Sequence, residues 1–172
     1  MDLNTLRDQP ADQLLRLFAE TVEELRRRNL VRSSNNPVAD YAEKIAAHAL
    51  GLRLIGQSGA GHDGVDDAGN RYQIKGRRVT LHNNSRQLSC IRNLDAKPFD
   101  HLVGFIFDTE FRVSRSCVIP FDVVSSRARF SKHVNGHLLL LRDEIWSIPS
   151  VRDVTAEMTK AAQEVCKGAC GR

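Results

Sequence analysis

A turn between two strand-like arms is the feature that most restricts the fold of this chain. Asp67-Ala68-Gly69-Asn70 is a run of residues that tolerate positive φ. Tyr72, Ile74 and Val79, which follow the turn, are typical of strands. The sequence therefore predicts a β-hairpin over residues 61–75, with one polar arm on each side of the turn.

The side chains of this hairpin bring oxygen ligands and a positive charge together. Because side chains alternate along a strand, Gln73 and Lys75 share one face. A loop of three or five residues places Asp63 on that face, whereas a loop of four residues places Asp66 there. In both registers one carboxylate meets the amide and the ammonium group, a combination that suits metal-dependent cleavage of phosphodiester bonds.

The composition fits one soluble domain with a real core. The chain has 172 residues, of which 41% are hydrophobic and 27% charged, and no apolar run approaches the roughly 18 residues of a membrane span. Its first residues lack the features of a secretory signal, so we expect a cytoplasmic protein without a membrane partner. The net charge of +4 permits nucleic-acid binding without requiring it.

Smaller features carry narrower predictions. The four cysteines show no disulfide framework and are interpreted as free thiols, although Cys166 and Cys170 lie one helical turn apart. The arginines at 26–28 fit a solvated helix face. Trp146 is expected to anchor the packing of the C-terminal region.

The predicted elements alternate between helices and strands. Apolar spacing predicts an amphipathic helix over residues 11–30, and Asn36 followed by Pro37 predicts a second helix that ends before Gly51. The remaining predictions are strands at 52–55, 101–107, 111–119 and 138–141, a glycine-rich loop at 56–61, a short helix at 121–127, a turn or helix at 143–146, and a disordered end from Lys167.

This order predicts an α/β (α+β) protein with a mixed central β-sheet flanked by helices. The expected organisation is an N-terminal helical extension over residues 1–32, a main domain over residues 36–150, and a C-terminal helix and tail over residues 151–172.

The main domain resembles the PD-(D/E)XK nuclease superfamily, the restriction-endonuclease-like fold, over roughly residues 36–78. In that superfamily an Asp is followed by a Glu or Asp two positions before a Lys, and a Glu lies on the preceding helix. Asp63 and Lys75 match the first and last positions, Glu43 is the helix candidate, and Gln73 stands where most members have a carboxylate. The Gln-x-Lys variant is similar to the Mrr-like branch.

The resemblance implies a Mg²⁺-dependent deoxyribonuclease, with Mn²⁺ as an alternative metal, that acts as an endonuclease of restriction or repair type. Asp63 would be the main metal ligand, Gln73 and the carbonyl of Ile74 would add oxygens, and Glu43 would complete the shell. Lys75 would orient the attacking water and offset charge on the phosphate.

Other residues are assigned to the nucleic acid. Arg77 and Arg78 follow the site directly and are expected to contact phosphate, together with His62. DNA is the expected partner, and the sequence does not separate it from RNA. Dimerisation through the first helix stays open.

Plain structural interpretations compete with each role. Asp63 could simply flank a turn, and Asp66 is then the reserve ligand. Lys75 could protect an edge strand from aggregation. Glu43 could be a solvated helix residue. Because the amide of Gln73 adds no charge, the alternative function is a catalytically silent module with the same fold. Such a module would bind nucleic acid or another protein.

Overall fold

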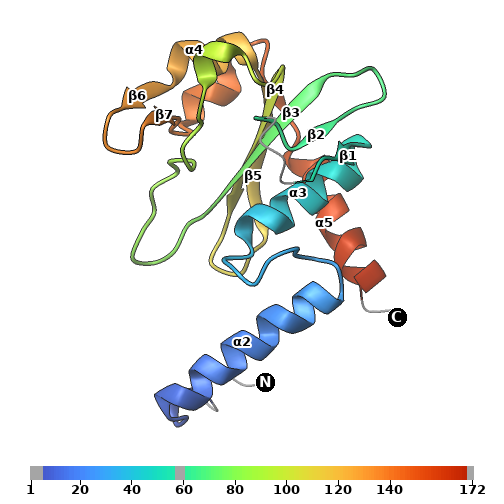
Figure 1. Cartoon of the computed structure of the whole chain (residues 1–172), viewed down its shortest axis with the longest axis vertical. Helices are drawn as coiled ribbons and strands as arrows, with labels where there is room; N and C mark the ends of the chain where they lie inside the picture. The colour runs from blue at the N-terminus through green and yellow to red at the C-terminus, as the bar shows by residue number, and fades with distance from the viewer. Residues whose placement is uncertain (1–5, 57–60, 170–172) are drawn as a thin grey trace.

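A six-stranded mixed sheet organises the chain. The computed structural model describes residues 6–56 and 61–169, and these form a mixed α+β fold (Figure 1). The strand order is β1 (Arg53–Leu54), β2 (Gly64–Val65), β3 (Arg71–Arg78), β4 (His101–Phe107), β5 (Val113–Pro120) and β8 (Arg152–Asp153). β3 and β4 are parallel, whereas the other neighbours in this sheet are antiparallel. The predicted mixed sheet is confirmed.

Two helices cover one face of the sheet. α3 (Val38–Leu50) packs on β3, and α5 (Thr155–Ala169) lies beside α3 and packs on β5 (Figure 1). Their shared core contains Ile45, Ile74 and Met158, all nearly inaccessible to solvent. α3 begins where the Asn36 side chain accepts a hydrogen bond from the Val38 N–H, and it ends at Gly51, whose φ of 64° only glycine adopts easily.

The opposite face is covered by shorter elements. They include η1 (Leu94–Ala96), α4 (Phe121–Arg127), the hairpin of β6 (Arg129–Ser131) and β7 (Gly136–Leu138), and η2 (Asp143–Ser147). Leu102, Ile119 and Leu141 are among the buried side chains of this second core. Since parallel strands need a long connection, residues 79–100 cross this face between β3 and β4.

The N-terminal helix α2 (Ala11–Arg27) stands away from the rest of the molecule (Figure 1). Val22 is buried, but Leu15 is 70% exposed and Phe18 is 60% exposed. The helix stops earlier than predicted because Asn29 has a φ of 57°, which breaks the helical backbone. The solvated interpretation of the arginines at 26–28 agrees with their ion pairs to Glu23 and Glu24 one turn away.

Several predicted boundaries were wrong. The strand expected at 138–141 is β7, Gly136–Leu138, and its partner β6 was missed because Arg129-Phe130-Ser131 is short and largely exposed. α5 continues through Lys167 to Ala169, where disorder was expected. Most of the predicted loop at 56–61, Cys170 and the last residues of the tail lie outside the described residues.

The cysteines and Trp146 agree with their predictions within the described residues. Cys90, Cys117 and Cys166 are free thiols. Within residues 6–56 and 61–169, none of the helices combines the length and apolar character that a bilayer span needs. Trp146 packs against the second core and donates a hydrogen bond to the Ser116 carbonyl, as an anchor of the C-terminal region should.

Candidate functional site

The register of the β2–β3 hairpin selects Asp63 over Asp66. Gly64 pairs with Tyr72 and Val65 pairs with Arg71, which leaves a five-residue loop over residues 66–70. With this odd loop length, Asp63 lies opposite Gln73, one of the two registers that the sequence left open. The hairpin therefore carries an acid and an amide at adjacent positions.

The Asp63 carboxylate binds directly to β3. Its Oδ2 atom accepts a hydrogen bond of 2.6 Å from the backbone N–H of Ile74 and a second one from the Gln73 amide nitrogen. The Oδ1 atom of Asp63 takes part in neither hydrogen bond. The Gln73 side chain uses its amide nitrogen here, not its amide oxygen. Because N–H and C=O of one strand residue point to the same side, the Ile74 carbonyl also faces this side of β3.

Glu43 approaches the same place from α3. It is only 8% exposed. Burial raises the pKa of Glu43 to about 7, and the Asp63 carboxylate adds to the rise, whereas Arg32 opposes it. A carboxylic acid with a raised pKa and a second acid nearby is a typical feature of functional sites.

Arg32 and Asp40 belong to the site, although neither residue was predicted to act there. The Arg32 guanidinium donates a hydrogen bond to Glu43 and forms a longer ion pair with Asp40 at 3.7 Å. Although burial raises the pKa of Asp40, hydrogen bonds from the backbone N–H groups of Arg32 and Ser33 hold it below its usual value. Asp40 precedes Glu43 by three residues, so helical spacing was the available signal.

These side chains line one cleft of about 420 Å³ between α3 and the hairpin. Glu43, Asp63 and Gln73 contribute to its wall, together with His62 and Arg32. The polar groups and the curved surface are therefore in one place, as a binding or catalytic site requires.

This wall leaves out five of the site candidates, namely Asp66, Ile74, Lys75, Arg77 and Arg78. Lys75 shares the strand face of Gln73 by alternation but does not line the cleft. Asp66 accepts hydrogen bonds from Asn70 and Tyr72 within the turn, so the reserve ligand is used structurally.

The two arginines after Lys75 are also engaged. Arg77 donates a hydrogen bond to the Ser85 carbonyl. Arg78 binds the Thr109 carbonyl and stacks over the Phe111 ring at 4.4 Å. Neither guanidinium lines the cleft, and both support neighbouring loops.

The oxygen atoms at the cleft suit a hard divalent cation when neutral oxygens are counted together with the carboxylates. Among the described residues, no three His, Cys, Asp or Glu side chains gather as a metal site. Glu43 and Asp63 supply two carboxylates, and the Gln73 amide and Ile74 carbonyl supply neutral oxygens. Mg²⁺ prefers oxygen ligands and keeps several waters, so two carboxylates suffice chemically.

Comparison of the sequence with protein-family models gives no match, and comparison with curated protein sequences gives none either.

Proposed function

We propose that this protein is a Mg²⁺-dependent nuclease that hydrolyses DNA phosphodiester bonds at the cleft between α3 and the β2–β3 hairpin. The observation that carries the proposal is the convergence of Glu43, Asp63 and Gln73 on one cleft. The order of these residues along the chain, and Lys75 two positions after Gln73, is the order of the PD-(D/E)XK superfamily. A restriction-endonuclease-like core is therefore part of the proposal.

Each residue would have a distinct task. Asp63 and Glu43 would hold the cation, with the Gln73 and Ile74 oxygens completing the protein ligands. When bound, the cation would lower the pKa of a water and polarise the phosphate. As the alternative to binding the cation, Glu43, whose pKa of about 7 lies near neutral pH, would exchange a proton with the attacking water or with the leaving oxygen. Lys75 would approach the phosphate from the sheet face it shares with Gln73 and offset negative charge.

One observation favours a second candidate function. Arg32 already pairs with Glu43, and Gln73 already donates a hydrogen bond to Asp63, so both carboxylates have partners without a cation. A module that binds nucleic acid without cutting it would retain these contacts. Such a module would bind DNA in a salt-sensitive way with little dependence on Mg²⁺.

Cleavage assays separate the two functions. The protein is incubated with plasmid, linear and branched DNA in the presence of Mg²⁺ or Mn²⁺, beside Asp63→Asn and Lys75→Ala variants. Asp67→Asn, in the exposed part of the same turn, is the matched control. We expect metal-dependent cleavage that both site variants lose and the control retains. Cleavage that survives both site variants contradicts the proposal, and metal-independent binding without cleavage supports the silent module.

A further inference from the structure

A second concave surface lies on the other side of the molecule, away from α3. It is a hollow of about 500 Å³ between α4, the β6–β7 hairpin and η2. Its rim carries Arg127, Arg129 and Arg142, and Glu144 is the acidic side chain of its lining. We call this surface the arginine hollow. Its three arginines are exposed, and Leu138, Leu140 and Ile145 contribute apolar surface.

The arginines of the hollow differ from many others in the chain because they have no acidic partner. Arg27, Arg71 and Arg112 each form an ion pair with a neighbouring carboxylate. Across residues 6–56 and 61–169, by contrast, the side chains of the three hollow arginines make no ion pair and no hydrogen bond. Their positive charge is therefore available to a ligand.

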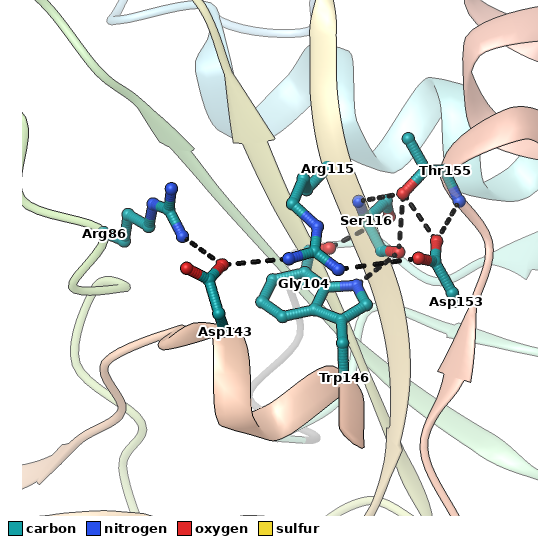
Figure 2. A network of polar contacts seen from close by, with 8 residues as sticks. All are labelled: Arg86, Gly104, Arg115, Ser116, Asp143, Trp146, Asp153 and Thr155. Atoms are coloured by element: carbon teal, nitrogen blue, oxygen red, sulfur yellow. Dashed lines mark hydrogen bonds and ion pairs between the residues drawn. The ribbon is translucent and has the colours of Figure 1, made fainter. Parts of the chain in front are cut away.

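A polar network engages Asp143, the acid that follows Arg142 in the chain. Figure 2 shows the Asp143 carboxylate between Arg86 and Arg115, at 2.7 and 2.9 Å. Arg115 also stacks over the Trp146 ring at 3.9 Å and reaches Asp153 on β8. Asp143 is therefore engaged by Arg115 on β5. Arg142, the residue before Asp143, lines the hollow.

We propose that the arginine hollow binds the phosphodiester backbone of DNA at a place separate from the cleft. Guanidinium groups match phosphate oxygens with paired donors, and three of them around one depression suit consecutive phosphates. The apolar surface of Leu138 and Leu140 suits deoxyribose carbons, and the Gln87 amide adds a neutral donor and acceptor.

This inference shares the DNA partner with the proposed function, but it needs neither the metal nor the cleft. Binding is therefore measured in EDTA, by fluorescence anisotropy of a labelled 20-base-pair duplex over a range of salt concentrations. The test variant is Arg129→Gln/Arg142→Gln. The matched control is Arg7→Gln/Arg16→Gln, which removes the same charge from exposed positions outside the hollow. Thermal melting checks that both variants remain folded.

We expect the hollow variant to bind the duplex about tenfold more weakly near 0.1 M salt. The slope of log affinity against log salt concentration should become less steep by about 1.8, because two phosphate contacts are lost. The control should change affinity by less than about twofold. Equal losses in both variants, or no loss in the hollow variant, overturn the inference. DNA binding through the hollow without cleavage would contradict the proposed nuclease activity and support the binding role of the hollow. Cleavage that does not depend on the hollow arginines would support the nuclease activity and contradict the binding role of the hollow.

Discussion

The Asp63 carboxylate accepts a hydrogen bond of 2.6 Å from the backbone N–H of Ile74, the residue that separates Gln73 from Lys75. This contact fixes the acid against the strand that carries the other candidate ligands. It also places the carboxylate within the electrostatic reach of Glu43 on α3. The geometry of the cleft thus depends on a backbone contact as well as on side chains, and the variants below test each support in turn.

Gln73→Glu should destabilise the metal-free protein and strengthen its response to Mg²⁺. The change removes the amide that donates to Asp63 and puts a second carboxylate beside it, which should cost about 1–3 kcal/mol of unfolding free energy. A bound cation relieves that repulsion. Thermal melting with and without Mg²⁺ measures both effects, and Gln163→Glu on the exposed side of α5 is the control. An unchanged Mg²⁺ response would argue against a metal at this position.

Glu43→Gln should flatten the pH dependence of stability. The pKa of Glu43 is about 7 in the folded protein and near 4.5 when unfolded, so the unfolded chain releases this proton first as the pH rises. The folded state therefore loses stability between about pH 4.5 and 7, by about 2 kcal/mol after allowance for solvent screening. Urea unfolding across this range should show the decline in the wild type and in a Glu157→Gln control, but not in Glu43→Gln.

Asp66→Ala should weaken the hairpin and leave metal binding intact. Asp66 accepts hydrogen bonds of 2.8 Å from the Asn70 backbone and side chain, which hold the five-residue loop closed. Its loss should lower the melting temperature and speed amide hydrogen exchange in residues 63–72. Asp67→Ala, which alters an exposed neighbour, is the comparison. If Asp66→Ala abolished the Mg²⁺ response while the hairpin stayed protected, Asp66 would be the ligand in place of Asp63.

Gly76→Ala should loosen the packing of α3 on β3. A Cβ atom at this position would lie 3.0 Å from Val38 Cγ1 and 3.2 Å from both Phe107 Cε2 and the Val38 carbonyl. This overpacking should cost about 1–3 kcal/mol in urea unfolding. Gly168→Ala, which meets no atom within 4 Å in α5, should instead stabilise the protein by up to about 1 kcal/mol. Equal stability of the two variants would show that α3 shifts freely.

Local chemistry predicted the hairpin well because its turn residues and alternation act over a few positions. Two registers remained open, since the length of the loop depends on whether the Asp66 side chain reaches Asn70. The same limit explains β6, which is too short to show a pattern and exists because β7 pairs with it. The C-terminal end of α5 is helical despite Gly168, because Met158 and Val165 are buried along it.

The cleft could be predicted only in part. The order of Glu43, Asp63 and Gln73 along the chain is recognisable. Arg32, in contrast, reaches Glu43 through a tertiary contact that sequence spacing does not predict. Arg77 and Arg78 were assigned to phosphate because they are adjacent in sequence to Lys75. The loops that follow β3 and β4 provide carbonyl groups for them, and such partners are invisible before the chain folds.

The parallel pairing of β3 with β4 is expected to separate an early step of folding from a late one. The β2–β3 hairpin closes over five residues, a local event that takes microseconds. The crossover at residues 79–100 can settle only when distant segments arrive, because Leu88 bonds to Leu139 and Ile91 bonds to His137. Contacts between residues so far apart in sequence form slowly. We therefore expect the hairpin that carries Asp63 and Gln73 to form before the crossover at residues 79–100 settles against the sheet.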